Sequence, residues 1–318
     1  MSKNKEQKSI LSESALLVRV SMSHPSGIKQ DKFLKNELAE SKNTSAHLLS
    51  VSKHIFGFDI NKHFRSIENN FRNDWYFPMT FPWQDGETVK SSWRLLPVSH
   101  LDKFEEKVRE AKISWDKEVA NFLKAYDRYL INAPQRLGDA YSVSDYPTQE
   151  EISEKFVFVR DHKQISSYDD TDIRIMGSER QRKLIADSMK DATEIAQTKL
   201  VEHVVNELED QLNRVQDAMK SYNPNEKGGK YFKDSMLDNL KDKNEKVSTI
   251  NDLINDDSLS EVTSKVALIL ASVNSVESLR DKTELGETRR EQLSDSIEDA
   301  KSDLNRNLIN NIFGGGNE

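Results

Sequence analysis

The chain has 318 residues, a net charge of −8 and no cysteine. The lack of cysteine excludes disulfide scaffolds, cysteine-ligated metal sites and thiol catalysis, and the charge argues against a strongly basic nucleic-acid binder. Charged residues make up 31% of the chain and hydrophobic residues only 36%, a balance typical of long helices with solvated outer faces.

The N-terminal region predicts a tail, a strand and a turn. Residues 1–13 are polar and predict a disordered tail, and Leu16–Met22 has the β-branched content of a strand. His24–Gly27 ends this strand, because proline and glycine supply turn conformations. The apolar part is far shorter than the ~20 residues of a membrane span, and no signal peptide is recognisable. We therefore expect a soluble protein of the cytoplasm.

Three short helices are predicted next, over residues 31–40, 46–56 and 60–74. The third has apolar residues at spacings of three and four, which place them on one helical face. These residues are Ile60, Phe64, Ile67 and Phe71.

The most aromatic part of the chain follows, from Trp75 to Trp83. Together with the Asp85-Gly86 turn signal and a second strand over 88–96, it predicts a β-hairpin or an aromatic loop. Such side chains are enriched in interface cores, so they are candidates for binding a protein partner; a small core beneath the helices is the alternative explanation. The candidates are Trp75, Tyr76, Phe77, Phe81, Trp83 and Trp93.

A long helix is predicted after this segment. Ser99 can cap its N-terminus with Asp102 in the capping-box position, and Pro134 limits its end to about Ile131. Its apolar residues form a heptad seam, which consists of Leu101, Phe104, Val108, Ala111, Trp115, Phe122 and Tyr129.

The remainder of the N-terminal part is predicted to be less regular. A loop covers 132–147, and Thr148 with Glu151 forms a second capping box that begins a short helix. Phe156–Val159 predicts a strand, and 166–172 predicts a polar loop.

From Ser178 a single helix is predicted to about Ser221. Its apolar residues form two seams whose phase changes after Ala196, which indicates a different neighbour for each half. The first seam is Ile185, Met189, Ala192 and Ala196, and the second is Val201, Val205, Leu208, Leu212, Val215 and Met219. We expect the second half to pair with the returning helix, and the first half to contact helix 101–129 or another subunit.

The rest of the chain predicts further helices. A hinge over 223–229 precedes a helix that ends before Asp256, and Ser258 with Glu261 caps the next helix. Apolar positions then continue to the glycines at 314–316. The final seam consists of Leu293, Ile297, Ala300, Leu304, Leu308 and Ile312.

The predicted fold class is mainly α. A small α+β N-terminal domain over 14–177, with the aromatic hairpin and the long helix, precedes long antiparallel helices over 178–313 that form a helical bundle or coiled coil. Residues 314–318 are predicted to be a flexible tail, because three glycines cannot sustain a helix.

No catalytic, metal or cofactor motif is recognisable. His47, His54 and His63 lack the spacing of a metal site, and His203 with Glu207 predicts a solvated ion pair rather than a di-iron motif. The acidic run at 169–172 lacks the glycine and glutamate of a calcium loop, and 227–230 lacks the frame of a phosphate-binding loop. We therefore expect a protein that is not an enzyme and has no cofactor or metal.

Three segments carry a resemblance to a known family. They are the strand Leu16–Met22, the aromatic hairpin that ends in Trp93–Pro97, and the helix from Leu101 to Tyr126–Tyr129. Over roughly 14–135 the chain resembles an uncharacterised family, a domain of unknown function, from phages and mobile elements. Its genes often lie beside those of a MoxR-type AAA+ ATPase and a von Willebrand A-domain protein. The resemblance implies a phage or plasmid origin and an ATPase partner, and it implies no active site.

These observations favour a non-enzymatic, oligomerising adaptor or assembly protein in the cytoplasm of the host cell. It would bind a MoxR-type AAA+ ATPase through its N-terminal part and form a homo-oligomer through its helices. The alternatives are a structural component of the virion and a single-strand nucleic-acid-binding accessory protein, which the net charge of −8 disfavours.

Overall fold

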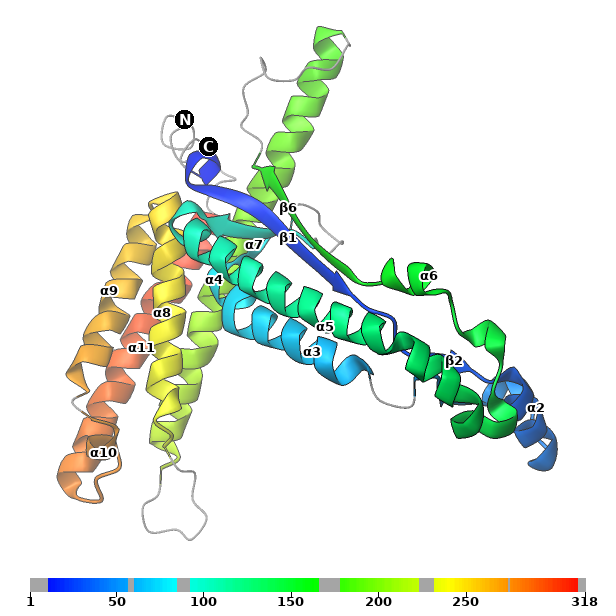
Figure 1. Ribbon diagram of the computed structural model, residues 1–318. Coiled ribbons are helices and arrows are strands. Elements are labelled where there is room, and N and C mark those ends of the chain that lie inside the picture. The colour runs from blue at the N-terminus through cyan, green and yellow to red at the C-terminus, as the bar shows by residue number, and fades with distance from the viewer. Residues whose placement is uncertain are drawn as a thin grey trace. The chain divides into compact units, whose positions relative to one another are not determined.

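The chain is mainly α-helical and divides into two compact units (Figure 1). Unit 1 contains Met1–Leu17, Pro82–Leu95 and Gln164–Glu318, and unit 2 contains Val18–Phe81 and Leu96–Lys163. The structure is a computed structural model. It describes residues 11–56, 60–84, 92–165, 178–222, 232–273 and 275–313.

The predicted fold class is confirmed: a small α+β part precedes long antiparallel helices. The predicted domain boundary at 177 lies outside the described residues, as do the hinge over 223–229, the polar loop over 166–172 and the final glycines. Part of the predicted N-terminal tail is ordered instead, because residues 11–14 form a helical turn in which Leu11 is buried.

Two small sheets lie in the α+β part. One has the strand order β4-β5-β1-β6, and in the other β2 (Ile28–Gln30) and β3 (Ser52–His54) are antiparallel. The predicted strand over Leu16–Met22 is therefore confirmed as part of β1. The strands of the larger sheet are β1 (Ala15–Ser23), β4 (Phe81–Pro82), β5 (Arg94–Pro97) and β6 (Val157–Gln164).

The helices of unit 2 begin with α2 (Lys32–Ser41), which is capped by Asp31: its side-chain oxygen accepts from the Leu34 amide at 3.0 Å. Next comes α3 (Ile60–Phe71), which continues through a π-helical turn, η2 (Arg72–Tyr76), into the short helix α4 (Phe77–Met79). These bounds confirm the predicted helices over 31–40 and 60–74.

The predicted helix over 46–56 is wrong. This segment contains a 3-10 turn, η1 (Ala46–Leu48), and then strand β3. The Asp31 amide donates to the Val51 carbonyl at 2.9 Å, and the Ile55 amide donates to the Gly27 carbonyl at 2.9 Å. Pairing with β2 therefore satisfies the backbone hydrogen-bonding groups of this segment in an extended conformation. The spacing of apolar residues along the sequence does not reveal such pairing.

Helix α5 (Leu101–Leu137) is longer than predicted and begins differently. A 3-10 turn, η3 (Val98–His100), leads into it, and Ser99 makes no capping hydrogen bond. Pro134 lies inside the helix, because hydrogen bonds to residues elsewhere in the chain stabilise the last turn. Arg136 donates to the carbonyl oxygens of Phe56 at 2.6 Å and of Ile55 at 3.1 Å.

The short helix α6 (Gln149–Ser153) confirms its predicted capping box. The Glu151 amide donates to Thr148 Oγ1 at 3.2 Å, and the Thr148 amide donates to the Glu151 carboxylate at 2.7 Å. Strand β6 follows it along the chain and confirms the strand predicted over Phe156–Val159, although β6 begins at Val157 and continues to Gln164.

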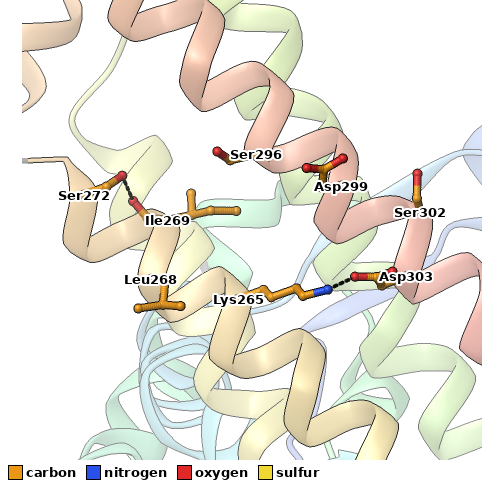
Figure 2. A pocket seen from close by; sticks show the side chains of 8 residues that line it. All are labelled: Lys265, Leu268, Ile269, Ser272, Ser296, Asp299, Ser302 and Asp303. Atoms are coloured by element: carbon orange, nitrogen blue, oxygen red, sulfur yellow. Dashed lines mark hydrogen bonds and ion pairs between the residues drawn. The ribbon is translucent and has the colours of Figure 1, made fainter.

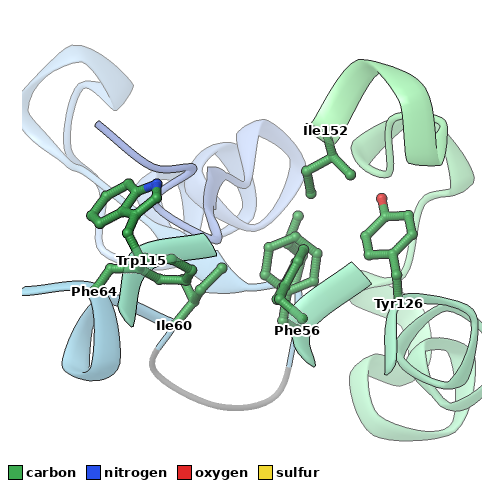
Figure 3. Packing of buried hydrophobic residues seen from close by; sticks show 8 residues of the cluster. Phe56, Ile60, Phe64, Trp115, Tyr126 and Ile152 are labelled. Atoms are coloured by element: carbon green, nitrogen blue, oxygen red, sulfur yellow. The ribbon is translucent and has the colours of Figure 1, made fainter. Parts of the chain in front are cut away.

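The core of unit 2 lies where α3, α5 and α6 meet (Figure 3). Phe64 and Trp115 contact edge to face, with ring centroids 4.9 Å apart, and Phe56 contacts Phe122 in the same manner at 5.2 Å. Such contacts add to the free energy of burying the rings. The cluster consists of Ile55, Phe56, Ile60, Phe64, Trp115, Phe122, Tyr126 and Ile152.

Unit 1 contains a helical bundle. In it α7 (Glu179–Lys220) packs against α8 (Ser235–Ile254) and α11 (Glu284–Phe313), and α9 (Asp257–Ser272) packs against both α8 and α11. The four helices thus enclose one core, and α10 (Val276–Leu279) is a short link before α11. The predicted pairing of the second half of α7 with the returning helix is confirmed.

The second seam of α7 lies in this core, and Val205, Leu208, Leu212, Val215 and Met219 are buried. Two amides within the bundle fix the axial positions of the helices, because each one finds a specific carbonyl. The Gln211 amide donates to the Met236 carbonyl at 2.9 Å, and the Gln216 amide donates to the Ser294 carbonyl at 3.1 Å.

One helix cap in the bundle differs from the prediction. Asp256, rather than Ser258, caps α9, since its carboxylate accepts from the amides of Ser258 at 2.9 Å and Leu259 at 3.1 Å. The preceding helix ends at Asn255, which has a left-handed backbone with a φ of 54°. Asparagine tolerates this conformation better than most residues do.

Candidate protein-binding surfaces

The aromatic candidates do not form one exposed surface. The side chains of Tyr76, Phe81 and Trp83 are buried, whereas Trp75 and Trp93 are half-buried and Phe77 is exposed. The stretch from Trp75 to Met79 is helical, so the predicted strand there is wrong, and residues 85–91 lie outside the described chain. What remains of the predicted hairpin is β4 beside β5, with the Trp83 amide donating to the Trp93 carbonyl at 3.2 Å.

Trp75 lies against the basic face of α5. Its ring centroid is 4.6 Å from Lys107 Nζ and 5.4 Å from Lys103 Nζ, which are cation–π distances. The hydrogen bond to Glu110, at 2.8 Å, raises the pKa of Lys107. The indole is therefore already engaged within its own unit, and of the six candidates Phe77 offers the most open apolar side chain.

The histidines do not converge on a metal site. His63 Nδ1 lies 3.9 Å from a carboxylate oxygen of Glu118, and the described residues contain no group of three or more His, Asp and Glu side chains that could hold a metal ion. His203 Nε2 lies 3.9 Å from a carboxylate oxygen of Glu207, and Lys243 approaches Glu207 to 2.8 Å; the predicted ion pair between His203 and Glu207 forms only when the imidazole is protonated. Desolvation lowers the pKa of His203, which favours its neutral form.

The first half of α7 carries exposed and half-buried apolar side chains. Leu184 is 61% and Met189 41% exposed, and no side chain before Ala196 in this helix is buried. Figure 1 shows this half of α7 extending beyond the bundle that its second half builds. We call Leu184, Ile185, Met189 and Ala192 the exposed seam.

The N-terminal end of α7 is well formed despite this exposure. Ser178 and Gln181 make a reciprocal capping box, with the Gln181 amide 3.3 Å from Ser178 Oγ and the Ser178 amide 2.8 Å from Gln181 Oε1. Arg180, Arg182 and Lys183 follow in the first turns, exposed and without an ion pair to any described residue. The exposed seam therefore begins beside a cationic patch.

A hollow of ≈ 610 Å³ lies between α9 and α11 of the same unit (Figure 2). Lys265 crosses it to an ion pair with Asp303, and it also approaches Glu261 to 3.1 Å. Leu268 is 70% exposed at its edge, and Asp299 on α11 forms no ion pair within the described chain. We call this feature the α9–α11 hollow, lined by Lys265, Leu268, Ile269, Ser272, Ser296, Asp299, Ser302 and Asp303.

Unit 2 has a groove of its own between α5 and β6. Two adjoining hollows of ≈ 460 and ≈ 320 Å³ share Lys112 and Phe158. Strand β6 is at the end of the strand order, so one of its edges has no partner strand among the described residues. Apolar side chains beside an open strand edge are a surface to which an extended peptide can add.

Sequence reasoning found one of these surfaces and missed two. The phase change after Ala196 indicated that the first half of α7 has a different environment from the second half. Nothing in the sequence indicated the α9–α11 hollow, because its lining residues come from two helices whose relative packing the sequence pattern does not specify. The groove beside β6 depends on strand order, which the sequence pattern does not specify.

Comparison of the chain with models of known protein families, with curated proteins and with solved structures finds no match. Among the helices that the structure describes, none is long and apolar enough to cross a membrane.

Proposed function

We propose that the chain is a non-catalytic assembly and adaptor protein that self-associates through its long helices. The exposed seam of α7 carries this proposal: Leu184, Ile185, Met189 and Ala192 lie on the first half of the helix, which begins with a complete capping box but has no buried side chain before Ala196. A helix segment of this length gains most of its stability from packing. A second protein surface would supply the packing that its own bundle does not.

The adaptor role requires a second partner. The proposed partner is the MoxR-type AAA+ ATPase that the resemblance over 14–135 implies, and the proposed location is the cytoplasm of the host cell. Support for a binding role of unit 2 comes from the groove beside β6, where Phe158 and the open strand edge are available to an extended segment.

The self-association is tested by light scattering during size-exclusion chromatography of the full chain. We expect a mass above the 36.6 kDa of one copy, and a shift toward one copy for Ile185→Asp. Ile113→Asp is the control, because Ile113 is also an isoleucine on a long helix and its side chain is exposed, whereas that of Ile185 is half-buried. A wild-type chain that stays a single copy at micromolar concentration would contradict the proposal.

The adaptor role is tested separately by co-purification of the chain with the products of its neighbouring genes. Retention of an ATPase on the wild-type chain is the expected result. Mass spectrometry of purified phage particles gives the opposing outcome: high copy number in the particle would replace the adaptor role by that of a virion component.

A further inference from the structure

We propose that the exposed seam of α7 in one copy docks into the α9–α11 hollow of a second copy. The inference rests on the proposed self-association and specifies its geometry. It joins two features of unit 1: the apolar surface on the first half of α7, and a hollow of ≈ 610 Å³ with Leu268 at its edge.

Charge complementarity favours this occupant. The exposed seam begins directly after Arg180, Arg182 and Lys183, which have no carboxylate partner among the described residues. The hollow presents Asp299, which has no cationic partner in the described chain, and beside it the carboxylate of Asp303. The exposed seams of two copies could instead pack against each other. In a parallel arrangement this would bring the two cationic patches together, which costs free energy.

The chemistry of the hollow also fits an apolar helix. Ser272, Ser296 and Ser302 are small and let a neighbouring backbone approach closely, and Leu268 and Ile269 supply apolar contact. A helix that lays its apolar residues into such a groove is a recurring mode of protein recognition.

The hollow of the same copy is not available to the seam. The second half of α7 is fixed in the bundle from Ala196 onward, and α7 is one continuous helix. Met189 lies seven residues before Ala196, which is about 10 Å along the helix axis, and the seam continues away from the bundle from there. The seam of one copy therefore meets the hollow only of another copy.

The resulting contact is heterologous, since two different surfaces meet. After one such contact the first copy keeps a free hollow and the second copy keeps a free seam, so the association continues into a ring or an open chain. A dimer in which both surfaces are filled would need a two-fold arrangement of two such contacts.

Site-specific crosslinking tests the pairing, and the cysteine-free chain makes it direct. Met189→Cys is prepared with one affinity tag and Leu268→Cys with another, and the two full-length variants are mixed with a short bifunctional thiol reagent. We expect a crosslinked product that carries both tags. Met189→Cys with itself and Val143→Cys with Leu268→Cys are the controls, and both are expected to give little product.

The outcomes separate the inference from the proposed function. Crosslinking of Met189→Cys with itself, without the mixed product, would overturn docking into the hollow while the self-association stands. No crosslink in any mixture together with a single-copy mass would overturn both.

A charge exchange gives an independent readout. Asp299→Lys and Lys183→Glu are each expected to weaken self-association by about two- to fivefold, the range of an exposed ion pair, and the double variant is expected to recover part of the loss. Asp252→Lys, which makes the same charge change at another exposed aspartate, is the control. Equal weakening by Asp252→Lys and Asp299→Lys would contradict a local contact in the hollow.

Discussion

Gly27 shows how one residue can fix a turn in unit 2. Its φ is +68°, and a Cβ atom there would lie 2.9 Å from Phe56 Cδ2 and 3.0 Å from Ile60 Cγ2. We expect Gly27→Ala to lower the free energy of unfolding by about 1–3 kcal/mol, because left-handed backbone strain adds to the close contact. Denaturant unfolding measures the change.

Gly138→Ala is the matched control for this prediction. Gly138 also has a positive φ, of 52°, but an added Cβ would meet no atom within 4 Å. It therefore carries the backbone strain without the contact. Equal destabilisation by the two variants would show that Phe56 and Ile60 yield without cost.

Tyr126 gives the core of unit 2 a distinct response to alkaline pH. Burial raises the pKa of its phenol to about 12, and the hydroxyl donates to the Pro147 carbonyl at 2.7 Å. The folded state therefore holds the proton more tightly than the unfolded state does, so stability is complete below pH ~10 and falls between pH ~10 and ~12. Thermal unfolding across this range should show the decline, and Tyr126→Phe should flatten it.

At the residue scale, the sequence located the aromatic side chains but did not show which of them are buried. Trp75 and Tyr76 are neighbours that both belong to the aromatic candidate set, yet Tyr76 is buried and Trp75 is only half-buried. Side chains in a helix follow a period of about 3.6 residues, whereas in a strand successive side chains alternate between the two faces of the sheet. Only the backbone conformation decides which aromatic is available to a partner.

Helix α7 has two halves with different roles. Leu208 is fully buried in the bundle, whereas Ile185 belongs to the exposed seam. We expect Leu208→Asp to unfold the bundle, because an isolated carboxylate there costs on the order of 5 kcal/mol or more, a large share of a typical domain's stability. Ile185→Asp should change the thermal midpoint little.

Circular dichroism during thermal unfolding measures both variants. An equal loss of helix in Ile185→Asp and Leu208→Asp, at a concentration where the wild-type chain is a single copy, would contradict this prediction. The first half of α7 would then be needed for folding of the bundle itself, and its exposure would not mark an assembly surface.

At the element scale, long periodic helices were predictable and short paired segments were not. The seam of α7 from Val205 to Met219 repeats over several turns, and its burial follows directly from that period. Residues 46–56 have no such length, and their conformation depends on pairing of β3 with β2. Likewise, the end of α5 depends on Arg136 reaching two distant carbonyls.

The assembly as a whole should respond to salt. If cationic residues near Lys183 meet Asp299 of another copy, raising the ionic strength screens the contact, since the Debye length falls from about 10 Å at 0.1 M to about 3 Å at 1 M. We expect the average mass in light scattering to decrease over that range. A mass that stays constant or rises would indicate a purely apolar contact through the exposed seam.

The division of the chain into two units has a consequence for dissecting the molecule. The chain passes from one unit to the other four times, and each passage falls within a strand of the larger sheet: β1, β4, β5 and β6. A single proteolytic cut between two of these passages leaves other passages intact, so parts of the two units stay covalently joined. A C-terminal piece that begins at Ser178 carries the bundle helices but lacks Pro82–Leu95, which belongs to the same unit. The protein therefore cannot be separated into its two units by cleaving the chain at one place.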